Sequence, residues 1–216
     1  MDTYDAYLFD LDGTLVDTAP DLMAGLNVCL AEHGYMEVDE ALTRRWVGHG
    51  VAKMIEQALV HQGSEEPPAH LAKSMFDRFL EYYGAHIADE SAPYPGVRET
   101  LDCLGQRAGL GVVTNKVSRL TTRLLEALDL ADPFGIVVCR DTIDAFKPAA
   151  DPALYACASL GVDPARTLFV GDSITDVQCA RAAGCDVVCV RYGYTGGVAP
   201  EDLGADRLID SLTGLI

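Results

Sequence analysis

Basic residues are scarce in this chain. It has 16 Lys and Arg against 33 Asp and Glu among 216 residues, which gives a formal net charge of −17. Nucleic acids and anionic membranes bind basic protein surfaces, so we expect neither as a partner. A small anionic molecule remains compatible with this charge, provided that positive side chains gather around its binding site.

The chain also lacks paired cysteines and long apolar runs. The odd number of cysteines, without any Cys-x-x-Cys pair, favours reduced core thiols in a cytoplasmic protein over a disulfide framework. No apolar run approaches the ~20 residues of a membrane-spanning helix, and Asp2, Asp5 and Asp10 interrupt the start, where a signal peptide would be apolar. The seven cysteines are Cys29, Cys103, Cys139, Cys157, Cys179, Cys185 and Cys189.

Apolar residues, in contrast, are plentiful at 49% of the chain, and 216 residues can form one domain with a smaller one attached. From Val97 onward, strand-like apolar runs alternate with helical spacing. This alternation predicts an α/β fold with a Rossmann-like parallel sheet that is covered on both faces. The expected strands are 110–113, 136–139, 167–170, 186–190 and a further one near 208–209.

The stretch between residues 17 and 90 shows only helical spacing. Pro20 suits the first turn of a helix, and Thr18 or Asp17 is the expected cap. A rigid Pro-Tyr-Pro-Gly run at 93–96 follows the last helix. We therefore predict an inserted α-helical cap domain on two linkers. The predicted domains are a cap at 17–90 and an α/β core at 1–16 and 91–216.

The first apolar run of the chain ends in the sequence Asp10-Leu11-Asp12-Gly13-Thr14. Side chains alternate along a strand, so this spacing can aim both carboxylates the same way. Neighbouring carboxylates repel and remain ionised together when a divalent cation lies between them. An ordinary acidic turn is the simpler reading. An EF-hand calcium loop is excluded because Leu15 and Asp21 occupy its glycine and glutamate positions.

Other polar residues also follow predicted strands. Thr114 and Asn115 come after one strand, Gly171 and Asp172 after another, and Lys147 lies in a loop region after a third. The carboxyl ends of parallel strands line one crevice, where ligands bind. The sequence thus predicts a metal site beside an anion site, with Thr114, Asn115 and Lys147 as ligands for phosphate oxygens.

These residues resemble the four motifs of the haloacid dehalogenase-type (HAD) phosphatases, and the resemblance covers nearly the whole chain. The motifs are Asp10-Leu11-Asp12-Gly13-Thr14, Thr114-Asn115, Lys147-Pro148 and Gly171-Asp172-Ser173-Ile174-Thr175-Asp176. Within that family the chain is most similar to the phosphoglycolate phosphatases. That similarity lies in Trp46-Val47-Gly48-His49-Gly50, Met54-Ile55-Glu56-Gln57-Ala58-Leu59, Val113-Thr114-Asn115-Lys116 and Tyr192-Gly193-Tyr194.

The resemblance implies a Mg²⁺-dependent phosphomonoester hydrolase, with 2-phosphoglycolate as the expected substrate. It implies that Asp10 is the nucleophile and forms an aspartyl-phosphate. Asp12 would protonate the leaving oxygen and then activate the hydrolytic water. The implied Mg²⁺ ligands are Asp10, the backbone carbonyl of Asp12, and Asp172.

The remaining motif residues would bind the phosphoryl group or orient the ligands. The resemblance assigns the phosphoryl group to Thr114 and Lys147, and it places Ser173 and Asp176 behind the direct metal ligands. The lysine motif departs from the usual Lys-Pro-x-Pro pattern because Ala150 replaces the second proline, so we expect a looser loop.

The specificity of the cap is left open by the sequence. Gly48, His49 and Gly50 are candidates for substrate contact. The alternative interpretation is a flexible turn whose histidine faces solvent. Lys116 is a rival phosphate ligand, although a solvated residue at a helix start is the favoured interpretation. Solvated helix faces are likewise favoured over substrate contact for the basic residues Arg44, Arg45 and Lys53. The aromatic and Met positions of the cap are expected in its core, and they are Met75, Phe76, Phe79 and Tyr83.

Four other functions remain possible on this pattern. A phosphatase for another phosphosugar or phospho-acid, a phosphomutase or a phosphonatase would use the same core. A receiver-like signalling module would also place carboxylates, a Thr and a Lys around Mg²⁺, but it has no use for a large helical insert. We expect a small phosphorylated metabolite as the binding partner, and a monomer or homodimer.

Overall fold

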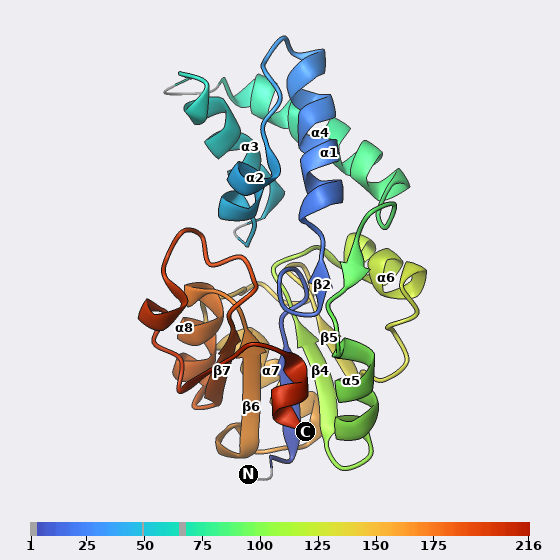
Figure 1. Cartoon of the computed structure of the whole chain (residues 1–216), viewed down its shortest axis with the longest axis vertical. Coiled ribbons are helices and arrows are strands. Elements are labelled where there is room, and N and C mark those ends of the chain that lie inside the picture. Colours follow the sequence, from blue (N-terminus) through green and yellow to red (C-terminus); the bar gives the residue numbers. More distant parts are fainter. Residues whose placement is uncertain (1–3, 49, 65–67) are drawn as a thin grey trace.

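The computed structural model describes residues 4–48, 50–64 and 68–216, and it contains a parallel six-stranded sheet (Figure 1). The strand order is β5-β4-β1-β6-β7-β8, and every pairing is parallel. The predicted α/β fold is therefore confirmed. The strands are β1 Ala6–Phe9, β4 Gly109–Val113, β5 Ile136–Val138, β6 Thr167–Gly171, β7 Asp186–Val190 and β8 Arg207–Ile209.

Strand β1 lies in the middle of the sheet between β4 and β6. All four of its residues are buried, which explains why it reads as a continuous apolar run. Tyr7 and Phe9 pack into the core on one face, whereas Leu8 packs into a second core on the other. From β1 the chain adds β4 and β5 on one side and then crosses to β6 on the other side. The strand order therefore reverses beside β1, and such a reversal forms a crevice where ligands bind.

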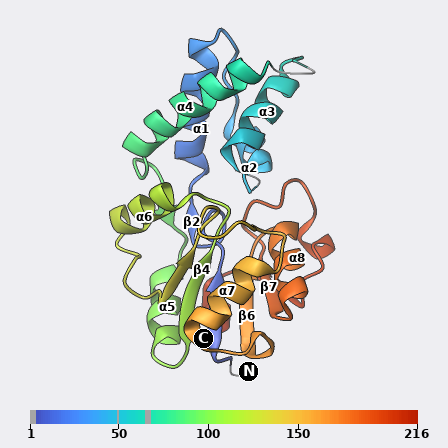
Figure 2. The same cartoon turned by 180° about the vertical axis from the view of Figure 1, so that it is seen from behind.

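Helices cover both faces of the sheet (Figures 1 and 2). Helices α7 and α8 pack against each other and against the strands on one face, and α5 lies on β4 together with the C-terminal turn η3. These elements are α5 Val97–Gly105, α6 Ser118–Ala127, α7 Asp151–Leu160, α8 Ile174–Ala183, η1 Pro164–Arg166, η2 Pro200–Asp202 and η3 Leu212–Leu215.

The segment between β2 (Val16–Asp17) and β3 (Ala92–Pro93) forms a separate helical layer above the carboxyl ends of the strands (Figure 1). Met75, Phe79 and Tyr83 recur every four residues along α4 and are fully buried, as their spacing predicts. Gly25 in α1 lets α4 approach closely, because a Cβ at this position would lie 3.0 Å from the Phe79 ring. The helices of this layer are α1 Ala19–Glu32, α2 Glu40–Trp46, α3 Val51–His61 and α4 Ala69–Ala85.

The two chain crossings between the layers lie side by side. Strand β2 (Val16–Asp17) pairs antiparallel with β3 (Ala92–Pro93), where the sequence predicts the two linkers. Helix α1 has Pro20 in its first turn, as predicted, but the Thr18 side chain makes no capping hydrogen bond. The Tyr194 hydroxyl replaces that cap, because it accepts hydrogen bonds from the backbone N–H groups of Thr18 (2.8 Å) and Ala19 (2.9 Å).

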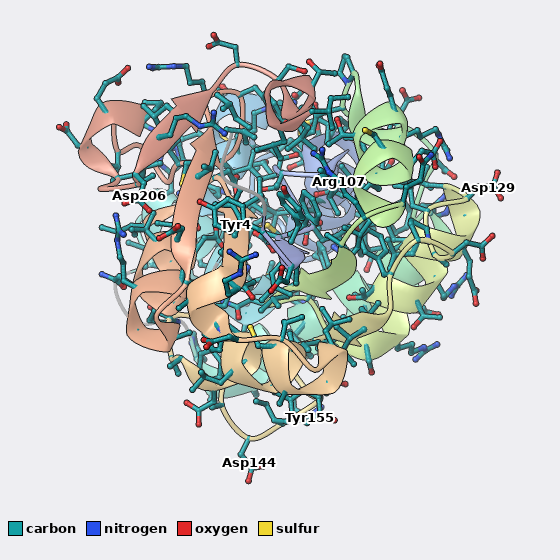
Figure 3. The ribbon with its side chains drawn as sticks, turned by 90° about the horizontal axis from the view of Figure 1, so that it is seen from below. Tyr4, Arg107, Asp129, Asp144, Tyr155 and Asp206 are labelled. Carbon is teal, nitrogen blue, oxygen red and sulfur yellow. The ribbon has the colours of Figure 1, made fainter. Side chains whose placement is uncertain are left out.

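The amino ends of the strands form the opposite end of the molecule, seen from below in Figure 3. Tyr4 lies there just before β1, and its hydroxyl donates a hydrogen bond to Asp186 at the start of β7 (2.8 Å). Among the described residues, no helix is both long and apolar enough to cross a membrane. The polar motifs of the sequence lie at the other end of the sheet, beneath the helical layer.

Candidate active site

The carboxyl ends of three neighbouring strands bring the predicted site residues together. Asp10 directly follows β1, Thr114 follows β4, and Asp172 follows β6. A cavity of about 290 Å³ opens between these strand ends and the helical layer. Its described lining includes Asp10, Asp12, Thr114, Asn115, Lys116, Lys147 and Ser173 from below, and Leu22, Trp46, Met54, Phe76 and Leu80 from the helical layer.

Three buried carboxylates form the acidic cluster of this site. Ligand oxygens of Asp10, Asp172 and Asp176 all lie within 4.8 Å of one another. An all-oxygen donor set of this kind fits a hard divalent cation, which also neutralises the mutual repulsion of the carboxylates. Asp10 and Asp172 are predicted metal ligands, whereas the Asp12 side chain points to a different partner, described below.

Lys147 lies between two of these carboxylates. Its Nζ is 2.7 Å from Asp10 Oδ1 and 2.7 Å from Asp176 Oδ1. Burial alone would lower the pKa of Lys147, but the charges of Asp10 and Asp176 outweigh burial and raise it, so the ammonium stays charged. Burial raises the pKa of Asp10 to about 7, because desolvation outweighs the attraction of Lys147.

Asp172 is held in a tight cradle. The Thr14 hydroxyl donates a 3.1 Å hydrogen bond to its Oδ1, and the backbone N–H of Tyr194 donates to its Oδ2. Burial raises the pKa of Asp172 well above its ordinary value, with the neighbouring carboxylates adding to the effect. Gly13 has φ +84°, and a Cβ there would lie 2.2 Å from Asp172 Oδ2, so only glycine fits this turn.

Asp176 is fully buried at the start of α8 and uses both of its oxygens within the protein. Its Oδ2 accepts hydrogen bonds from the N–H of Asp172 (3.2 Å), the N–H of Ser173 (3.0 Å) and the hydroxyl of Ser173 (2.6 Å). Its Oδ1 accepts from Lys147. Asp176 therefore orients the loop that carries Asp172. The position of Ser173 and Asp176 behind the direct metal ligands stays a prediction.

Asp12 and Lys116 form a second, partly buried ion pair at the cavity. Lys116 Nζ lies 2.9 Å and 3.2 Å from the two carboxylate oxygens of Asp12, and the Thr18 hydroxyl donates a 2.7 Å hydrogen bond to the same carboxylate. The Lys116 side chain is only 6% exposed, so the solvated interpretation favoured from sequence is wrong. The reason is tertiary: Tyr83 of α4 covers it, with Nζ 4.8 Å from the ring centroid.

Asn115 fastens the lysine loop. Its Oδ1 accepts a hydrogen bond from the N–H of Lys147 (3.1 Å), and its Nδ2 donates to the Lys147 carbonyl (3.1 Å) and to the Gly48 carbonyl (3.3 Å). The side-chain amide is thus engaged by backbone groups, and its direct phosphate contact remains a prediction. Thr114 is buried, and its Oγ accepts from the N–H of Lys116 (3.1 Å).

The candidate specificity residues of the helical layer are only partly described. Gly48 and Gly50 line the cavity, whereas His49 lies outside the described residues. Phe76 also lines the cavity, which corrects the expectation that it belongs wholly to the core of the insert. The cause is the position of Phe76 at the edge of the buried face of α4. A side chain at such an edge contacts the neighbouring space, which here is the cavity.

Arg44 is another correction. It does not simply face solvent, because its guanidinium pairs with Asp17 of β2 (2.7 Å) and lies 5.3 Å from the centroid of the Tyr194 ring. Burial opposes but does not outweigh its hydrogen bonds to Asp17 and Glu40, so the pKa of Arg44 is raised. Lys53, in contrast, is about half exposed and pairs with Glu56, as expected for a solvated helix face.

Similarity to known proteins is consistent with this geometry. A family model described as haloacid dehalogenase-like hydrolase matches residues 7–190. A phosphoglycolate phosphatase from Nitrosococcus oceani is 41% identical over 95% of this chain and 92% of the relative. An N-acetylmuramic acid 6-phosphate phosphatase from Pseudomonas aeruginosa is 40% identical over 98% of this chain and 92% of the relative.

Solved structures give the same result for the fold. The crystal structure of a predicted phosphoglycolate phosphatase from Haemophilus somnus 129pt superposes with a TM-score of 0.93. It is 31% identical and the match covers 98% of this chain and 96% of that one. The family model and these relatives extend over nearly the whole chain, and the strand-end carboxylates, threonine and lysine occupy one cavity within it. The chain belongs to the haloacid dehalogenase-like hydrolase family.

Proposed function

We propose that this protein is a Mg²⁺-dependent phosphomonoesterase that hydrolyses 2-phosphoglycolate to glycolate and phosphate through an aspartyl-phosphate on Asp10. The single observation that carries the proposal is the position of Asp10. Its carboxylate lies at the end of the central strand, 2.7 Å from the Lys147 ammonium and inside a cluster of carboxylates. A carboxylate so placed can attack phosphorus while neighbouring positive charge receives the phosphoryl oxygens.

In the first step an Asp10 carboxylate oxygen bonds to phosphorus as the ester bond to the leaving oxygen breaks. Asp12 protonates that leaving oxygen, and Thr114 and Lys147 hold the phosphoryl oxygens. Asn115 fixes the backbone of Lys147 and so sets where the ammonium lies. The products of this step are the free alcohol, an aspartyl-phosphate and an ionised Asp12.

In the second step Asp12 takes a proton from water, and the water oxygen bonds to phosphorus as the bond to Asp10 breaks. Phosphate leaves and the Asp10 carboxylate is regenerated. Splitting one difficult displacement into two easier ones is the benefit of a covalent intermediate.

Mg²⁺ fits the site because Asp10 and Asp172 offer oxygen ligands from two adjacent strands, with the Asp12 carbonyl as the third assigned ligand. When bound, it supplies charge stabilisation to the phosphoryl oxygens. Asp172 is presented by Thr14 and Tyr194, and Asp176 orients its loop.

Support for 2-phosphoglycolate comes from relatives of that name at about 40% identity over most of the chain. The relative named for N-acetylmuramic acid 6-phosphate has comparable identity, so that phosphosugar is the second candidate. The cavity of about 290 Å³ with an apolar roof has room for a ligand larger than a two-carbon acid.

The test is phosphate release from 2-phosphoglycolate, N-acetylmuramic acid 6-phosphate and a panel of small phosphomonoesters, with Mg²⁺ or EDTA. We expect 2-phosphoglycolate to have the highest kcat/KM, EDTA to abolish turnover, and Asp10→Asn to lose it while its circular dichroism spectrum stays native. Retained turnover in Asp10→Asn would remove the nucleophile assignment. A preference for another ester would keep the mechanism and change the substrate, and an isomerised product without net phosphate release would indicate a mutase.

A further inference from the structure

Lys116 is a buried cation that the phosphoryl chemistry leaves unused. In the proposed mechanism, Thr114 and Lys147 hold the phosphoryl oxygens. The Lys116 ammonium is bound instead to both oxygens of Asp12 and lies beneath the Tyr83 ring. Burying an ammonium group is costly unless it is paired, and here the pairing places it on the lining of the cavity.

The contact with Asp12 locates Lys116 relative to the substrate. A proton donor must lie within about 2.6–3.2 Å of the leaving oxygen that it protonates. Lys116 Nζ is 2.9 Å from the same carboxylate, so it lies only two hydrogen bonds away from that oxygen. Whatever chemical group is attached to the leaving oxygen therefore passes close to Nζ.

The other cations of the described lining have different partners. Lys147 is bound by Asp10 and Asp176, and the Arg140 guanidinium lies against the Phe146 ring, 3.0 Å from its centroid. The roof of the cavity is apolar. Its described residues from the helical layer include Leu22, Trp46, Val51, Met54, Phe76 and Leu80.

We propose that Lys116 is a specificity-determining residue that binds a carboxylate attached next to the leaving oxygen of the substrate. This inference rests on the proposed phosphatase function. In 2-phosphoglycolate a single methylene separates the ester oxygen from the carboxylate, which matches the short distance between Asp12 and Nζ. An ammonium has three N–H donors, so Nζ can bind the substrate carboxylate while it keeps its bond to Asp12.

The experiment compares 2-phosphoglycolate with 2-hydroxyethyl phosphate, which has a neutral hydroxymethyl group in place of the carboxylate. The measured quantity is the ratio of the two kcat/KM values in the wild type, Lys116→Met and Lys116→Arg. Arg140→Met removes another cation of the described cavity lining, one that lies against the Phe146 ring. Lys53→Met removes an exposed lysine as a control for net charge. Circular dichroism and thermal unfolding establish that each variant is folded.

We expect the wild type to prefer the carboxylated ester, and Lys116→Met to reduce that preference by about 10- to 100-fold, the range of one charged hydrogen bond. Lys116→Arg keeps the charge and should retain part of the preference. Arg140→Met and Lys53→Met should change the ratio by less than about threefold, since neither cation lies beside the leaving oxygen.

Two results would overturn the inference. If Lys116 serves only to hold Asp12, both esters lose activity alike in Lys116→Met and the ratio stays constant. If Lys116→Met does not fold, the wild-type ratio decides, because equal turnover of the two esters leaves no carboxylate preference to explain. Failure of the proposed function is distinct from both, since the wild type would then release phosphate from neither ester.

Discussion

The Tyr194 hydroxyl joins the two layers of the protein, and its removal should be costly. It accepts hydrogen bonds from the backbone N–H groups of Thr18 (2.8 Å) and Ala19 (2.9 Å), and it donates one to Asp17 (2.6 Å). Tyr194→Phe keeps the ring but leaves two donors at the start of α1 without their acceptor. A helix start left without a cap costs about 0.5–2 kcal/mol, and each buried unsatisfied donor costs about 1–3 kcal/mol.

We therefore expect Tyr194→Phe to lower the free energy of unfolding by about 3 kcal/mol. For a chain of this length each kcal/mol lowers Tm by roughly 2–4 °C, so Tm should fall by roughly 6–12 °C. Urea unfolding followed by circular dichroism measures the free energy, and calorimetry measures Tm. The metal should be absent in both, so that ligand binding does not mask the change.

Tyr192→Phe is the matched control. Tyr192 also has a hydroxyl at the same crossing, but this hydroxyl makes a single hydrogen bond, to the Thr14 carbonyl (2.8 Å). Its loss should cost about 1 kcal/mol. If Tyr194→Phe is no more destabilising than Tyr192→Phe, the Tyr194 hydroxyl does not cap α1 and the reasoning fails.

Two further predictions concern the acidic cluster. Without metal, burial raises the pKa of Asp10 in the folded protein to about 7, from 3.8 for an unperturbed carboxyl. The proton on Asp10 therefore adds to the free energy of unfolding, fully below pH 3.8, and this contribution is lost as the pH rises to about 7. Asp10→Asn should therefore show a smaller fall in Tm between pH 4 and pH 8 in EDTA; an identical fall in both proteins would contradict the assignment. Gly13→Ala would place a Cβ 2.2 Å from Asp172 Oδ2 at φ +84°, so we expect at least about 2 kcal/mol of destabilisation and loss of phosphatase activity. Urea unfolding and phosphate release measure both effects, and a native-like Gly13→Ala would show that the cradle of Asp172 is looser than described.

Local sequence patterns were sufficient to predict the strands of the sheet and the helices that cover it. Strand β7 has the predicted bounds, 186–190, because a short apolar run is a signal contained in neighbouring residues. Strand β5 ends at Val138, one residue earlier than predicted. The carboxyl ends of parallel strands lie at one edge of the sheet, and this general rule was sufficient to predict that Asp10, Thr114 and Asp172 lie close together.

Contacts between residues far apart in the chain were decided only by the tertiary structure. Lys116 reads as a solvated helix-start residue, yet Asp12, 104 positions away, and Tyr83 of the helical layer enclose it. The cap of α1 comes from Tyr194, 176 positions beyond Thr18. No local period encodes such a partner, because it depends on how two layers pack. The sequence by itself thus determined the class of fold and the chemical groups of the site, whereas packing decided which charges are buried and which side chains hold them.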